Sequence, residues 1–159
     1  MILKSVYIVF IGVLLATFIG VGIAAFYPSP KIPESSKPIY PYEINREATP
    51  SAEYIKKQEV ESQKWRDHQE KVETYNKNVS IISAVASILI LIVSLILFKQ
   101  LLLIADGLLL GGVLVLLYSI VRGFGANDDM FRFGVVTIGL MVALFLGYIK
   151  LIKSSPFTN

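Results

Sequence analysis

Asp106 is the first residue to consider for chemistry, because it is the one acidic side chain inside a long apolar run of the sequence. An ionisable group at membrane depth is a candidate for proton or ion transfer. A transporter would normally add further buried polar groups or interrupted helices, whereas the other apolar runs carry charge only near their ends. We interpret Asp106 as a candidate intramembrane polar site with a structural role, either capping its helix or reaching Lys99.

Three further acceptor side chains are consecutive, at Asn127, Asp128 and Asp129. A calcium site needs about six oxygen ligands at defined spacing, and this loop does not provide them. His68 is the only histidine and the chain has no cysteine, so the ligand set of a zinc site is missing. We predict no metal site and a polar turn, in which Asp128 or Asp129 caps the following helix.

Known catalytic motifs are also missing from the sequence. It contains no glycine-rich phosphate loop, no HExxH and no GxSxG, which are the patterns typical of nucleotide binding, metalloproteases and serine hydrolases. We therefore predict no catalytic residue, no cofactor and no enzymatic activity. A membrane enzyme that acts on lipid is the least favoured of the function classes considered below.

The elements that must position these residues are long apolar helices. Of 159 residues, 54% are hydrophobic and 17% are charged, against about a quarter charged in soluble domains. Four apolar runs reach the roughly 20 residues that a membrane-spanning helix requires. The predicted fold class is an all-α membrane protein with four transmembrane helices, the second of which extends outward as a polar helical stalk.

The predicted organisation has eight segments. They are a transmembrane helix at 1–27, a proline-rich extended segment at 28–50, a polar extracytoplasmic helix at 51–78, transmembrane helices at 79–98 and 101–121, a short outer loop at 122–130, a transmembrane helix at 131–152 and a cytoplasmic tail at 153–159. The first helix is too long for a typical secretory signal peptide, so we expect an uncleaved signal anchor. Cleavage after Gly22-Ile23-Ala24 is the alternative.

The positive charges near the ends of the spans predict the orientation. Lysine and arginine are retained on the cytoplasmic side. One side carries Lys4, Lys99, Lys150 and Lys153, and the other carries Arg122 and Arg132. We expect both termini in the cytoplasm and localisation to a prokaryotic cytoplasmic membrane.

The polar segment has two halves of different character. Six of the seven prolines lie between residues 28 and 50, where they favour extended chain and a semi-rigid spacer. From Thr49 and Pro50 onward a cap, a first-turn proline and opposite charges four residues apart favour helix. A narrow apolar stripe on this helix is the candidate partner contact, formed by Trp65, Val72 and Tyr75. The stripe could also meet the chain's own proline-rich segment, and a fully solvated stalk is the remaining alternative.

Small residues recur at helical spacing in the spans, and we predict that they pack helices together, because they let two backbones approach. The candidate packing residues are Gly12, Ala16, Gly20, Ala24, Gly107, Gly111, Gly139, Ala143 and Gly147. In the second span Ser80, Ser83, Ser87 and Ser94 could form hydrogen bonds across helices. Packing within one chain is favoured over a homo-oligomer.

Residues 28–78 hold as many basic as acidic groups, so this segment lacks the positive charge that nucleic-acid binding requires. The expected function is a non-enzymatic accessory or assembly subunit, which contacts a larger membrane or extracytoplasmic protein through its polar helix. A small oligomeric pore or transporter is the alternative. The remaining expected partners are membrane lipids.

Overall fold

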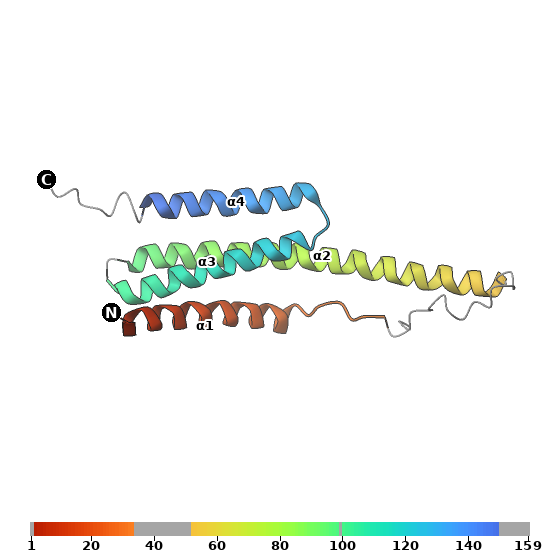
Figure 1. Cartoon of the computed structure of the whole chain (residues 1–159), viewed down its shortest axis with the longest axis horizontal. Helices are drawn as coiled ribbons and strands as arrows, with labels where there is room; N and C mark the ends of the chain where they lie inside the picture. Colours follow the sequence, from red (N-terminus) through yellow and green to blue (C-terminus); the bar gives the residue numbers. More distant parts are fainter. Residues whose placement is uncertain (1, 34–51, 99, 150–159) are drawn as a thin grey trace.

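A computed structural model describes residues 2–33, 52–98 and 100–149 (Figure 1). Within these ranges the chain forms four helices and no strand. The helices are α1 (Ile2–Phe26), α2 (Ala52–Leu97), α3 (Leu102–Phe124) and α4 (Asp129–Gly147). All four are long and apolar enough to cross a membrane, which confirms the prediction of an all-helical chain with four such helices.

Several predicted features lie outside the described residues. They are most of the proline-rich segment, the cap at Thr49 and Pro50, the Lys99 side chain, and the end of the chain with Lys150 and Lys153. The part of the proline-rich segment that is described, residues 28–33, forms neither helix nor strand. Proline at positions 28, 30 and 33 explains this, because it removes backbone donors and fixes an extended-compatible φ.

Helix α2 continues without a break from polar into apolar sequence. It contains 46 residues and is roughly 70 Å long at 1.5 Å per residue. No glycine or proline occurs between residues 51 and 106, and opposite charges four residues apart, such as Arg66 and Glu70, add local support. The polar part, residues 52–78, is called the α2 extension here. It projects beyond the other three helices (Figure 1).

Helix α3 is the centre of the arrangement. It packs against α2 and α1 over much of its length, whereas its contact with α4 is much smaller and α1 barely touches α2. The start of α1 and the end of α4 lie at one end of the bundle, and the α2 extension points away from the opposite end (Figure 1). Helix α4 therefore stands at one edge of the molecule, with most of its surface open.

A ladder of serine hydroxyls joins α2 to α3. Ser80, Ser87 and Ser94 each donate a hydrogen bond of 2.7–2.8 Å to a main-chain carbonyl oxygen of α3. These serines are seven residues apart, and their acceptors on Ser119, Gly112 and Ala105 are seven residues apart in the opposite direction. The spacing fits two antiparallel helices that cross at a shallow angle. Ser83 instead donates to Val79 within its own helix.

Glycine residues bring α1 and α3 into close contact. A Cβ atom on Gly12 would lie 2.9 Å from the Leu110 side chain, and one on Gly107 would lie 2.8 Å from Ile11. At Gly111 a Cβ would lie 2.8 Å from Leu15 and 3.2 Å from the Gly12 carbonyl oxygen. Each glycine on one helix therefore receives a bulky side chain from the other, and the two backbones approach as small-residue packing requires.

Candidate functional site

Polar and aromatic side chains of different helices meet where the α2 extension joins the bundle. We call this region the junction and define it by Tyr27, Tyr75, Asn76, Lys77, Asn78, Tyr118, Arg122 and Asp128. These residues are the residue after α1, residues in the middle of α2 and at the end of α3, and the residue before α4. The junction thus joins all four helices at one level.

The first contact of the junction joins α1 to α2. The rings of Tyr27 and Tyr75 stack with their centroids 5.3 Å apart and their planes at 6°. The Asn78 amide donates a hydrogen bond of 2.8 Å to the Tyr27 hydroxyl. Tyr75 is only 7% exposed and packs in a small core with Ile23 and Val79. Burial of one aromatic ring against another fixes the end of α1 beside the base of the extension.

Arg122 makes the second contact, between α2 and α3. Its guanidinium lies 5.6 Å from the ring centroid of Tyr75 and 5.4 Å from that of Tyr118. It also donates hydrogen bonds of 3.0 Å to the Tyr118 hydroxyl and to the Asn76 side-chain oxygen. The Asn76 amide in turn donates to the Gly125 carbonyl oxygen at 3.2 Å. A planar cation suits this role, because it can contact ring faces and still form directed hydrogen bonds.

The third contact joins α2 to the start of α4. Asp128 is the N-cap of α4 and accepts a hydrogen bond of 3.0 Å from the Phe131 backbone N–H. The other carboxylate oxygen accepts from the Lys77 ammonium at 3.2 Å. The backbone N–H of Phe131 and the Lys77 ammonium hold the pKa of Asp128 below its usual value, because both favour the charged form. The prediction that Asp128 or Asp129 caps the fourth helix is confirmed at Asp128.

The acceptor groups near the loop between α3 and α4 form local contacts that hold the turn. Asp129 pairs with Arg132 at 2.9 Å, and Arg132 also donates to the Phe124 carbonyl oxygen. Asn127 has a φ of 49°, in the left-handed region that asparagine tolerates better than most residues. Among the described residues, no group of three or more His, Asp or Glu side chains is placed to hold a metal ion.

Two clefts separate the start of the proline-rich segment from the α2 extension. The larger has a volume of about 730 Å³ and lies between Tyr27, Pro28 and Pro30 on one side and Asp67, Glu70, Lys71 and Tyr75 on the other. The smaller measures about 350 Å³ and includes Lys31, Lys64 and His68. Segments 28–33 and 64–75 therefore run beside each other, as the sequence analysis allowed.

The predicted partner stripe is only partly exposed. Trp65 is 42% exposed and makes an edge contact with the His68 ring, and Val72 is half-buried. The prediction that Tyr75 is a partner contact needs correction, because its ring is buried between Tyr27 and Arg122. Helical spacing identified the face correctly as apolar, but α1 and α3 already cover its lower part.

Some of the candidate packing residues contact a neighbouring helix and others do not. Gly12, Gly107, Gly111 and Gly139 receive side chains of neighbouring helices, Gly139 that of Ile120. Ala16 is half-buried on the face of α1 that carries Gly12. For contacts within one chain, the prediction is wrong at Gly20, Ala24, Ala143 and Gly147. A Cβ on Gly20 or Gly147 would meet no atom within 4 Å, and Ala24 and Ala143 are exposed.

Asp106 lies in the second turn of α3 and is half-buried. The N-cap residue of α3 is Leu101, which provides no side-chain cap. Asp106 is therefore not at the capping position, which was one of the two roles predicted for it. It is also far along the chain from the junction, which lies at the other end of α3.

Comparisons with known protein families, curated proteins and solved structures give no match to this chain. The class of the protein follows from its helices alone. With four helices that are long and apolar enough to span a bilayer, it is a multi-pass membrane protein.

Proposed function

We propose that the protein is a non-enzymatic accessory or assembly subunit of a membrane complex and that it contacts a larger partner through the α2 extension. The main support for this proposal is that the extension is rigidly joined to the bundle. It is one helix with a membrane span, and its base is fixed to α1, α3 and α4 through the junction. A helix held in this way presents its outer surface to a partner in a defined orientation, with little ordering entropy left to lose on binding.

The surface of the extension supports a protein partner. From residue 55 to residue 60 every side chain is exposed, and Ile55, Val60 and Trp65 are exposed apolar groups between charged residues. Lys64 and Asp67 take part in no hydrogen bond or ion pair of the described structure, so their charges are available to a partner. A protein interface has an apolar core and a polar rim, which exposed apolar groups among charged ones could form, whereas balanced charge does not provide the positive patch that a nucleic-acid site needs.

In this proposal the extension is an extracytoplasmic stalk, both termini are cytoplasmic, and α1 is retained as a signal anchor in a prokaryotic cytoplasmic membrane. The excess of lysine at the end opposite the extension supports this orientation. Retention of α1 is supported by its interlocking contacts with α3 at Gly12, Gly107 and Gly111, because cleavage would expose these glycine surfaces. The pore or transporter alternative has less support, because the groove beside α4 is lined almost entirely by apolar side chains and the groove beside α1 has Lys4 as its one charged lining residue.

The test is recovery of a partner from native membranes after mild detergent extraction. The intact protein is cross-linked through lysine and compared with a variant that lacks residues 51–73. This deletion ends before Tyr75, so the junction and the four spans are kept. The expected result is a stoichiometric larger protein that is cross-linked to the intact chain through Lys56, Lys57, Lys64 or Lys71 and that, without cross-linker, co-purifies with the intact chain but not with the variant.

A matched control variant carries Thr137→Ala on α4. Thr137 donates only to the Phe133 carbonyl oxygen of its own helix, so partner recovery should not change. If the partner is recovered equally well with the deletion variant, the extension is not the contact and the proposal fails. Recovery of the intact chain alone as a defined homo-oligomer would favour the pore or transporter instead.

A further inference from the structure

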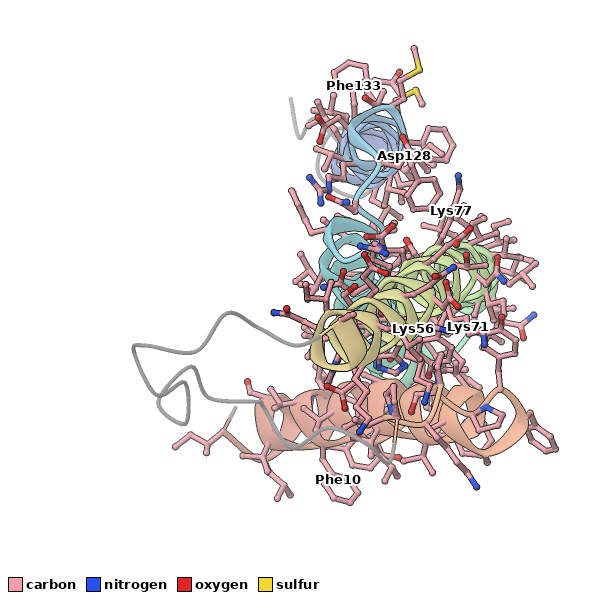
Figure 2. All side chains as sticks on the ribbon, turned by 90° about the vertical axis from the view of Figure 1, so that its right-hand side faces the viewer. Phe10, Lys56, Lys71, Lys77, Asp128 and Phe133 are labelled. Carbon is pink, nitrogen blue, oxygen red and sulfur yellow. The ribbon has the colours of Figure 1, made fainter. Side chains whose placement is uncertain are left out.

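A groove of about 370 Å³ lies between α2, α3 and α4, in the half of the bundle nearer the junction. It opens sideways, because α4 packs only loosely on the other helices. Figure 2 looks along the molecule from the side of the extension and shows α4 at one edge, with Lys77 and Asp128 between α4 and the central helices. The groove is lined mainly by apolar residues, among them Ile81, Ala84, Ile88, Leu116, Gly134 and Ile138.

We propose that this groove binds one phospholipid molecule of the leaflet on the side of the α2 extension, with hydrocarbon between α2 and α4 and the phosphate beside Lys77. The inference does not depend on the function proposed above. It assigns a specific lipid site to a protein for which contact with bulk lipid is already expected.

Hydrocarbon is the favoured content of the groove on physical grounds. The polar atoms in its lining belong to the main chain and to Ser80 and Ser119, and these hydroxyls are fully buried and hydrogen-bonded to each other's helices. Ordered water needs two or more polar partners, and the hydrocarbon core of a bilayer supplies none. The groove is therefore filled by acyl chains or by apolar side chains of another helix.

The dimensions of the groove suit an acyl chain, and Lys77 at its outer end favours a lipid over the side chains of another helix. Its lining extends from residue 80 to 88 on α2 and from 130 to 138 on α4, which corresponds to a length of about 12 Å on each helix. A volume of about 370 Å³ over this length gives a cross-section of roughly 30 Å². Carbon atoms in contact are about 4 Å apart, so an extended acyl chain needs only roughly 15–20 Å².

Lys77 provides a headgroup contact at the outer end of the groove. It lies one helical turn before Ser80 and Ile81, and its ammonium is 5.1 Å from the ring centroid of Phe131, which lines the groove. An ammonium has three N–H donors, of which Asp128 receives one, and 44% of the Lys77 side chain is exposed. A lysine that reaches from the edge of the apolar region to headgroup level is a suitable phosphate contact.

Charge at this end of the groove is balanced, since Lys77 and Arg132 are paired with Asp128 and Asp129. We therefore expect phosphatidylethanolamine and phosphatidylglycerol to bind about equally well. A preference for anionic lipids would require a net positive charge at this end of the groove, which this group of residues does not have.

The experiment uses the full-length chain reconstituted in vesicles of phosphatidylethanolamine and phosphatidylglycerol. The protein is extracted again in mild detergent, and native mass spectrometry counts the lipids that remain on each chain. Gly134→Leu is the central variant, because a Cβ at Gly134 meets no atom within 4 Å and the added side chain would occupy the groove. Gly147→Leu is the matched control, as it lies on the same helix with equally open surroundings but outside the groove.

The expected result is one phospholipid retained on the unmodified chain and on Gly147→Leu, with an occupancy about tenfold lower on Gly134→Leu. Ala84→Leu, which fills the groove from the α2 side, should reproduce the loss if Gly134→Leu fails to fold. Equal retention on all variants would overturn the proposal, as would a monomer that retains no lipid. A lipid-free dimer that dissociates with Gly134→Leu would also overturn it, and would assign the groove to contact between two copies of the chain.

Discussion

Ser80 and Ser119 each donate a hydrogen bond of 2.8 Å to the other's main-chain carbonyl oxygen. Both side chains are fully buried, and their hydroxyl oxygens are 3.4 Å apart. The exchange joins the two helices at the point where α2 passes from its extension into the bundle. The two serines fulfil each other's hydrogen-bonding requirements without a charged group, so no charge has to be buried in the apolar environment.

The first prediction concerns this pair. Ser80→Ala should lower the free energy of unfolding in detergent by about 1 kcal/mol, since hydrogen bonds between membrane helices contribute about 0.6–2 kcal/mol. The measurement is thermal or denaturant-induced unfolding followed by circular dichroism. Ser83→Ala is the control, because Ser83 is equally buried but donates only within α2. Equal losses for the two variants would contradict a specific role of the bonds between helices.

The second prediction compares two glycines of α1 that the sequence pattern treats alike. Gly12→Leu should destabilise the bundle by about 1–3 kcal/mol or more, because the new side chain must displace Leu110. Gly20→Leu should leave the melting temperature of the monomeric chain unchanged, because its Cβ meets open space. The melting temperature of both variants in detergent is the readout. Destabilisation of the monomer by Gly20→Leu would show that α1 packs differently from the arrangement described here.

The third prediction separates stability from partner binding in the apolar stripe of α2. Tyr75→Ala should lower the free energy of unfolding by about 3 kcal/mol, because it removes a buried ring that stacks on Tyr27 and contacts Arg122. Trp65→Ala should change it by less than about 0.5 kcal/mol, as expected for an exposed position, and should weaken recovery of the partner. A stable Tyr75→Ala variant would contradict the structural role of the junction.

The fourth prediction follows from the lowered pKa of Asp128. A carboxylate whose pKa is lower in the folded state stabilises the fold above its unfolded pKa, and this contribution is lost as the pH falls through the folded value. The stability difference between the unmodified chain and Asp128→Asn should therefore be complete at neutral pH and shrink below about pH 4.

Unfolding measured from neutral to acidic pH tests this dependence on Asp128. Asp129→Asn is the control, because the Asp129 side chain is 96% exposed and pairs only with Arg132 three residues away. Asp128→Asn should reduce stability at neutral pH more than Asp129→Asn does. A difference that persists unchanged in acid would show that the charge of Asp128 is not responsible.

The helices were predictable because the bilayer imposes a simple requirement of about 20 apolar residues. The continuity of α2 was predictable as well, since neither glycine nor proline occurs between Ser51 and the end of α2 at Leu97. Serines 80, 87 and 94 were identified as candidates for bonds across helices, and they make these bonds. In each case a local property of the sequence was sufficient to predict the feature.

The junction was not predictable, because it depends on which helix covers which face. Tyr75 shares a helical face with Trp65 and Val72, and the sequence does not reveal that Tyr27 and Arg122 meet only the lower part of that face. The same limit explains the glycines. Gly12 and Gly20 belong to one stripe, but α3 crosses α1 at Gly12 and leaves Gly20 open. Two local signals for the junction are present: the capping position of Asp128, which was predicted, and the four-residue spacing of Tyr118 and Arg122, which places both on one side of α3.

The unbroken path of α2 gives the extension a fixed reach. Residues 52–78 span roughly 40 Å, and a helix with neither glycine nor proline has no built-in hinge. A partner bound at the tip of the extension would stay at a fixed distance from the bundle. Because the extension is roughly 40 Å long, a tilt of about 10° at the junction would move its tip sideways by roughly 7 Å. A small displacement among the packed spans would thus be magnified at the tip, and a load on the tip would act first on the junction and then on the serine ladder between α2 and α3.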